Sequence, residues 1–230
     1  MPNSDNYQKR KIGIIGAGAM GVALAIEIKE RFPDLDVEIY EAHNDILEGS
    51  SGGTPGRMGL GYHYSHLETA LKYLEYTISF IRKFPESIKK DDLEGRYFIT
   101  NNSLVDAGSL LKVYSKISEA YNEIAQKDPD IMKILGGSPF SHKFLTREDY
   151  EDYVSPEKVN IAVATIEKIF DIDKFRSNVR DKLSKLGVKI YFNTKISKII
   201  KNKDGFNLEY EMVGESAVGK KEKFAKINQI

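Results

Sequence analysis

The sequence contains no cysteine among its 230 residues. This absence excludes disulfides, thiolate zinc sites, iron–sulfur clusters and cysteine nucleophiles. Charge of either sign is not in excess, because 34 basic residues balance 34 acidic ones. No electrostatic feature therefore favours nucleic acid or an anionic membrane surface as a partner. An apolar run of about 18 residues without glycine, which a membrane span requires, is also lacking, so we expect a soluble, cytoplasmic protein.

What is present is enough apolar sequence for a buried core, since 41% of the residues are hydrophobic and 10% are aromatic. Short β-branched runs alternate with amphipathic stretches, which indicates α/β structure. We expect strands at 12–15, 37–40, 96–100, 161–165, 188–192, 196–200, 206–210 and 224–230, and helices at 19–31, 67–84, 106–124 and 173–187. The segment 128–139 has turn residues and mixed charge, and is expected to form loops.

The stretch from Lys9 to Glu30 can be interpreted in two ways. Basic residues, a short apolar run and Ala23-Leu24-Ala25 are typical of a secretory signal peptide. The same stretch contains Gly16-x-Gly18-x-x-Gly21, which is typical of a dinucleotide-binding turn between a strand and a helix. Four glycines would weaken an apolar helix, at about 1 kcal/mol each relative to alanine, so we favour the turn.

Each glycine of this turn has a physical reason. Gly16 permits the tight bend, Gly18 lets a pyrophosphate approach the backbone, and Gly21 lets the helix pack on the sheet. Backbone N–H groups at the helix start then face the phosphates with about half a positive charge. Glu41 ends the next strand, twenty residues after Gly21. Its carboxylate can accept hydrogen bonds from ribose hydroxyls and would repel a 2′-phosphate, which disfavours NADP.

A glycine-rich segment, EGSSGGTPGRMGLG, follows at residues 48–61. Ser50 and Ser51 can donate hydrogen bonds to phosphate oxygens, and the glycines allow close backbone approach. Arg57 could stabilise an anion on a reduced flavin or bind a substrate carboxylate. Equally, it could bind a phosphate or hold a loop.

These residues resemble the D-amino-acid-oxidase-like, glutathione-reductase-fold family of FAD-dependent oxidoreductases. The resemblance is carried by IIGAGAMG (residues 14–21), by Glu41 and by SSGGTPGRMGLGYHY (residues 50–64). A helical pattern at 175–183 followed by GVKIYFNTKISKI (residues 187–199) is also similar to the family's later helix and strands.

The resemblance implies FAD as the cofactor and hydride transfer to flavin N5 from a C–N or C–O bond of a small amine, amino acid or 2-hydroxy acid. It implies that Ile196 lies where family members hold adenine through backbone groups. The expected cofactor-binding residues are Gly16, Ala17, Gly18, Ala19, Met20, Gly21, Glu41, Ala42, Ser50, Ser51, Arg57, Met58, Gly59 and Ile196.

Arg57 and His63 are the expected catalytic residues, His63 because imidazole titrates near neutral pH. A lone histidine is also commonly a structural hydrogen-bonding group. Asp171 and Asp173 resemble a metal pair, but capping of a helix N-terminus explains them better. His43, His66 and His142 are too scattered for a metal site, so no metal ion is expected.

The expected architecture is a Rossmann-like FAD-binding domain at residues 1–85 and 161–230, interrupted by a mixed α+β substrate region at 86–160. The family's A-T-G turn and final flavin segment have no counterpart, so we expect the C-terminal part of the fold to be missing and apolar edge surface to be exposed. A second chain could complete the fold. The alternatives are an NAD-dependent dehydrogenase and a non-catalytic dinucleotide-binding fragment.

Overall fold

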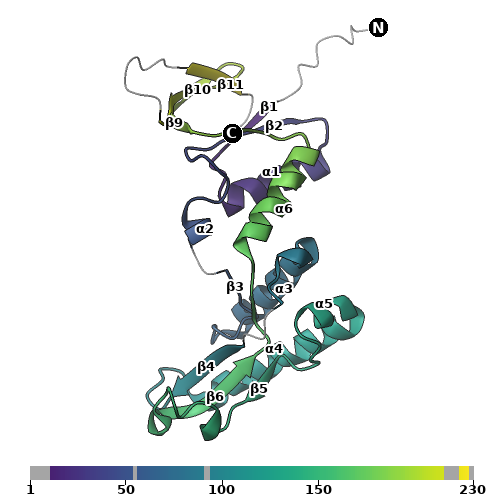
Figure 1. The fold of residues 1–230 in the computed structure, drawn as a ribbon, viewed down its shortest axis with the longest axis vertical. Helices are drawn as coiled ribbons and strands as arrows, with labels where there is room; N and C mark the ends of the chain where they lie inside the picture. The colour runs from purple at the N-terminus through teal and green to yellow at the C-terminus, as the bar shows by residue number, and fades with distance from the viewer. Residues whose placement is uncertain (1–10, 54–55, 91–93, 215–222, 228–230) are drawn as a thin grey trace. The chain divides into compact units, whose positions relative to one another are not determined.

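The computed structural model describes residues 11–53, 56–90, 94–214 and 223–227, and the chain divides into two compact units (Figure 1). Unit 1 comprises residues 1–54 and 176–230, and unit 2 comprises residues 55–175. The expected boundaries of the inserted region were 86 and 160. Unit 2 begins earlier because residues 58–81 share one core with residues 99–163, and it ends later because Ile166 and Phe170 pack against that core.

Unit 1 is built on a parallel sheet in the order β1-β2-β8. Its strands are β1 (Lys11–Ile15), β2 (Asp36–Tyr40) and β8 (Lys189–Tyr191). The register pairs Ile12 with Val37 and Ile39 with Ile190. The central strand β2 is buried on both faces, since Val37, Glu38, Ile39 and Tyr40 are all buried.

Two helices cover one side of this sheet, α1 (Ala19–Arg31) and α6 (Ile172–Lys185) (Figure 1). Parallel crossovers are right-handed almost without exception, so the helices before β2 and β8 are expected on one face when the strand order advances from β1 to β2 to β8. Val22, Ala25 and Ile26 of α1 are buried. The chain leaves α6 through Gly187 at φ +70°, so the expected left-handed glycine ends this helix.

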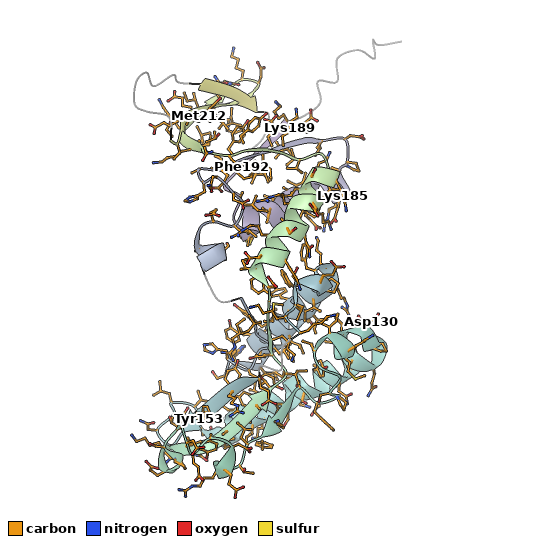
Figure 2. The ribbon with its side chains drawn as sticks, viewed as in Figure 1. Asp130, Tyr153, Lys185, Lys189, Phe192 and Met212 are labelled. Carbon is orange, nitrogen blue, oxygen red and sulfur yellow. The ribbon has the colours of Figure 1, made fainter. Side chains whose placement is uncertain are left out.

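An antiparallel sheet in the order β11-β10-β9 lies on the other side of the parallel sheet (Figure 1). Its strands are β9 (Thr194–Asn202), β10 (Gly205–Met212) and β11 (Lys223–Ile227). Tyr40 of β2 and Leu208 of β10 are buried together, with Ile196 packed against them. Figure 2 labels Lys189 at the start of β8, Phe192 directly after its last residue, and Met212 at the end of β10. Residues 228–230 of the expected last strand lie outside the described part of the chain.

Unit 2 contains an antiparallel sheet in the order β4-β6-β5 and a two-stranded ladder, β3-β7. The three-stranded sheet consists of β4 (Gly95–Thr100), β5 (His142–Phe144) and β6 (Val159–Thr165). The ladder pairs β3 (Arg57–Met58) with β7 (Lys168–Ile169) in register Arg57 with Ile169. Strand β3 carries Arg57 and Met58, two of the residues expected to bind the cofactor.

Helices α3 (Leu67–Lys83) and α4 (Ala107–Lys127) pack together over a shared core. Asp106 caps α4 as expected, because its carboxylate accepts a hydrogen bond of 2.9 Å from the Ser109 N–H. The expectation of loop at 128–139 was wrong in part, since α5 (Pro129–Ile134) forms there. Proline is tolerated at the first helical position, and burial of Ile131 holds the short helix. Shorter elements are α2 (Ser50–Gly53), η1 (Pro85–Ser87), η2 (Arg147–Asp149) and η3 (Pro156–Lys158).

Candidate functional site

The glycine turn of unit 1 joins the end of β1 to the start of α1. Gly16 has φ +95°, which favours glycine, and its N–H donates to the Tyr40 carbonyl at 2.8 Å. A Cβ on Gly21 would lie 2.0 Å from the Gly16 carbonyl oxygen, so a side chain there would push the helix off the turn. A Cβ on Gly18 would meet only the Ser51 hydroxyl, at 3.6 Å. The turn thus needs two glycines for its own folding and leaves the backbone at Gly18 approachable.

The N-terminus of α1 is without an acidic residue in its first turn, and Gly18 as N-cap offers no side chain. Helix N-termini leave several N–H groups without an intrahelical partner. Ser51 Oγ accepts one of them, that of Ala19, at 3.2 Å. Ser51 of the glycine-rich segment therefore lies at the start of α1, and its role at a phosphate site stays a prediction.

Glu41 follows β2 and is buried, with 7% of the residue exposed. Its Oε2 accepts the Ala17 N–H at 2.5 Å, and its Oε1 accepts the His43 N–H at 2.8 Å. The backbone of Glu41 is fixed as well, because its N–H donates to Tyr191 and its carbonyl accepts from Thr194. A carboxylate has about four acceptor positions, so two backbone bonds leave acceptor capacity for ribose hydroxyls.

The other residues expected to bind the cofactor in unit 1 differ in the exposure of their side chains. Ala17 is fully buried, and the side chain of Met20 is exposed. Ala42 follows Glu41 directly and is half-buried. Ile196 packs its side chain against Tyr40 and Leu208, so only its backbone could face a ligand. Their roles stay predictions.

Arg57 of unit 2 does not stand alone. Its Nη2 lies 2.9 Å from Oε2 of Glu167, a carboxylate that the sequence analysis missed. The guanidinium also lies over the Tyr97 ring, 4.9 Å from its centroid. Met58 is buried, and the carbonyl of Gly59 accepts a hydrogen bond of 2.6 Å from Thr77. The sequence offers only a weak signal for Glu167: it follows the mostly apolar stretch 161–166 and is next to a second charge, Lys168, so the pattern does not show which of the two is buried with a partner.

His63 is exposed, and its ring contacts only that of Tyr64 in the described part of the chain. His142 is the histidine with a buried partner instead, because its Nδ1 lies 3.0 Å from the Tyr62 hydroxyl, which also contacts Ser141 Oγ at 2.5 Å. Burial lowers the pKa of His142 and raises the pKa of Tyr62. The geometry gives His63 no support as a general base and draws attention to His142.

His142 also lines a cavity of about 430 Å³ in unit 2, together with Ser138, Phe140, Thr165 and Lys168. This volume is within the range of small-molecule pockets, about 300–1,000 Å³.

Asp171 caps α6 as expected, since its Oδ1 accepts the N–H groups of Asp173 and Lys174. In the described residues no group of three or more histidines and acids is arranged to hold a metal ion. No helix in this part of the chain is both long and apolar enough to cross a membrane.

Comparison with known proteins identifies the family. The profile described as "FAD dependent oxidoreductase" (DAO) matches residues 11–225. A curated relative, the FAD-dependent monooxygenase kojA of Aspergillus flavus, is 24% identical over 196 residues, which cover 84% of this chain and 40% of that protein. The chain therefore belongs to the DAO family of FAD-dependent oxidoreductases. This match confirms the resemblance and FAD as the cofactor, and disfavours the nicotinamide alternative.

Solved structures confirm the α/β fold. L-proline dehydrogenase from P. horikoshii matches with a TM-score of 0.59 at 15% identity, covering 96% of this chain and 51% of that one. Glycine oxidase from Geobacillus kaustophilus matches with a TM-score of 0.58 at 14% identity, covering 95% of this chain and 54% of that one. The chain thus spans about half the length of these structures and 40% of the curated relative.

Proposed function

We propose that this chain supplies the ADP-binding part of an enzyme that oxidises a C–N or C–O bond of a small amine, amino acid or 2-hydroxy acid. The observation that carries the proposal is the meeting of the α1 N-terminus with the buried Glu41 carboxylate, bridged by the Ala17 N–H at 2.5 Å. Amides and a carboxylate at adjacent strand ends match two neighbouring parts of an ADP moiety, the pyrophosphate and the ribose.

The donor set fits FAD on its chemistry. The first-turn amides of α1 and the Ser51 hydroxyl can bind phosphate oxygens, which prefer N–H and O–H donors at a positive helix end. Glu41 can accept from ribose hydroxyls, because its two backbone bonds leave acceptor capacity. FAD, when bound, supplies the acceptor of a hydride at N5. The chain's own contribution is to bind, orient and balance charge.

Arg57 of unit 2 is the residue we assign to anion stabilisation. Partial burial by itself lowers the pKa of Arg57, but the charge of Glu167 and the contacts with Tyr97 outweigh it and raise the pKa. The guanidinium is therefore cationic at every working pH, which suits an anionic group on substrate or cofactor. Amino acids are favoured as substrates because the names of the matching structures include proline dehydrogenase and glycine oxidase.

Because this chain spans only about half the length of the matching structures, we extend the proposal to the rest of the family fold. The remaining half of the family fold completes the site, either in the same polypeptide or in a second chain. Ile15, Met20 and Leu24 expose 44%, 84% and 51% of their surfaces along β1 and α1. In the described residues β1 pairs with β2 alone, so its other edge can accept a strand. The second candidate function is dinucleotide binding without catalysis, because the half of the family fold that this chain spans contains the expected ADP-binding residues.

The experiment is a flavin titration. FAD is added to the purified chain, and absorbance and fluorescence report binding, first in the unchanged protein and then in Glu41→Gln. We expect the substitution to weaken FAD binding about tenfold or more, since a charge-assisted hydrogen bond contributes about 1.5–3 kcal/mol. Asp34→Asn, at the opposite end of β2 and exposed, is the matched control. Equal FAD affinity in Glu41→Gln and the unchanged chain would show that Glu41 does not bind the ribose. Absence of FAD binding to the unchanged chain would reject the proposal.

A further inference from the structure

Glu167 is a buried carboxylate whose three hydrogen-bonding partners come from two separate segments of unit 2, residues 57–60 and strand β4. Its side chain is 1% exposed. Oε2 accepts from Arg57 Nη2 at 2.9 Å and from the Tyr97 hydroxyl at 2.8 Å, and Oε1 accepts the Leu60 N–H at 2.7 Å. Three donors satisfy a buried carboxylate, which otherwise would be too costly to keep charged.

The surroundings of this pair are built to admit it. A Cβ on Gly95 would lie 2.8 Å from Glu167 Oε2 and 3.3 Å from Arg57 Nη2. The same Cβ would lie 2.4 Å from Thr165 Oγ1, so no other residue fits at position 95 without a shift. The strand β4 therefore presents bare backbone at the point where the ion pair packs.

The two partners differ sharply in exposure. Glu167 is enclosed, whereas 49% of the Arg57 side chain is exposed. One guanidinium nitrogen is fixed by Glu167, and one guanidinium face is covered by the Tyr97 ring, whose hydroxyl holds the same carboxylate oxygen. In the described part of the chain Glu167 is the sole carboxylate that pairs with Arg57. Glu167 and Tyr97 thus hold the Arg57 guanidinium in one orientation, with part of the cation exposed.

We propose that Glu167 is a positioning residue, which holds the Arg57 guanidinium in the orientation that binds an oxyanion, a carboxylate or a phosphate. The inference rests on the role proposed above for Arg57 and adds to it the residue that acts through Arg57. A guanidinium recognises carboxylate and phosphate through a planar fork of N–H groups, so its orientation matters as much as its charge. Fixing it in advance removes the ordering cost that a mobile arginine would meet on binding.

The expected effect of Glu167→Gln on anion affinity is opposite to the effect that charge alone predicts. Removal of a negative charge next to Arg57 should strengthen anion binding if charge alone decided. If orientation decides, Glu167→Gln should weaken it, because the guanidinium is no longer held by an ion pair. The two explanations therefore give opposite results in one measurement.

The test is a titration of the whole ¹⁵N-labelled chain with sodium acetate and, separately, with inorganic phosphate. The readout is the Nε–H resonance of Arg57, assigned by its loss in Arg57→Lys. We expect a saturable shift in the unchanged chain, and a dissociation constant at least about fivefold higher in Glu167→Gln. Glu151→Gln is the matched control, because Glu151 forms an exposed ion pair with Arg147 in the same unit. Preference for acetate indicates a carboxylate ligand, and preference for phosphate indicates a phosphate.

Equal or tighter anion binding in Glu167→Gln would overturn the proposal, as would an Arg57 resonance that responds to neither anion. Tyr97→Phe decides the matter if Glu167→Gln does not fold. This variant removes one hydroxyl from Glu167 Oε2 without changing any charge, and should weaken anion binding about twofold, whereas unchanged binding counts against positioning. FAD binding is measured separately through Glu41 of unit 1, so loss of the proposed function and loss of this inference give different results.

Discussion

The Ala17 N–H donates a 2.5 Å hydrogen bond to Oε2 of Glu41, a residue 24 positions further along the chain. It joins the glycine turn after β1 to the end of β2, which are adjacent strands of one parallel sheet. Because the second carboxylate oxygen accepts the His43 N–H, Glu41 holds two loops before any ligand arrives. The ligand site and the local fold therefore depend on the same side chain.

Glu41→Gln should accordingly lower stability as well as FAD affinity. An amide offers one acceptor oxygen, so one of the two backbone N–H groups loses its partner, at a cost of about 1–2 kcal/mol in unfolding free energy. Urea denaturation followed by far-UV circular dichroism measures this loss. The exposed control Asp34→Asn should change it by less than about 0.5 kcal/mol. A Glu41→Gln chain as stable as the unchanged one would show that the two bonds contribute nothing to the fold.

The glycines of the turn should separate folding from binding. Gly21→Ala places a Cβ 2.0 Å from the Gly16 carbonyl, so we expect a loss of about 2 kcal/mol or more in stability. Gly18→Ala meets only Ser51 Oγ at 3.6 Å, so stability should be preserved while FAD affinity falls, because the methyl group obstructs the approach of a pyrophosphate. Denaturation and flavin titration on both variants measure the two effects. Undiminished FAD affinity in Gly18→Ala would argue against a phosphate at this turn.

The geometry of the glycine turn and of Glu41 in unit 1 was predictable because its signals are local in sequence. A strand, a turn that needs glycine at two positions and an acid at the end of the next strand lie within thirty residues, and each follows from backbone sterics or parallel pairing. Gly187 and Asp106 were predictable for the same reason, since a left-handed helix end and an N-cap depend on neighbouring residues.

The unit 2 network could not be predicted in this way. Arg57 and Glu167 are 110 residues apart, and Tyr62 and His142 are 80 apart. Periodicity shows that a residue is in a strand or helix, but it does not show which distant strand lies opposite. His63 was expected to be catalytic because imidazole titrates near neutral pH, and His142 was considered only as a metal ligand, since no local pattern shows that His142 is half-buried beside Tyr62.

The buried position of His142 should appear in the pH dependence of stability. Burial lowers its pKa below the ordinary value of about 6.5, so the unfolded chain binds a proton that the folded chain does not. Stability contributed by this group is complete above about pH 6.5 and falls as the pH drops through the window below it, with a slope of at most about 1.4 kcal/mol per pH unit.

His142→Asn keeps a polar atom near the Tyr62 hydroxyl and removes the titration, so this part of the slope should vanish. Urea denaturation between pH 5 and pH 7.5 measures it. His66→Asn is the matched control, because His66 is exposed and contacts only Thr69 in the described part of the chain. An identical slope in His142→Asn and the unchanged chain would show that His142 does not titrate differently on folding.

The ion pairs of Asp45 should affect the dependence of stability on pH at more acidic values, below about pH 4. Partial burial alone raises the pKa of Asp45, but hydrogen bonds from Arg180 and the Ile46 N–H, with the charges of Arg180 and Arg176, outweigh it and lower the pKa. A carboxyl whose pKa is lowered on folding stabilises the protein above its unfolded pKa of about 3.9, and this stabilisation is lost as the pH falls through the folded value.

Asp45→Asn should therefore lower the free energy of unfolding by about 0.5–1 kcal/mol at pH 7, a small value because half of the Arg180 side chain is exposed. The cost should shrink progressively below pH 4, where the unchanged chain also becomes neutral at this position. Denaturation at pH 7, 4 and 3 tests this, with exposed Asp152→Asn as control. A difference that persists undiminished at pH 3 would assign the effect of Asp45 to packing rather than to its charge.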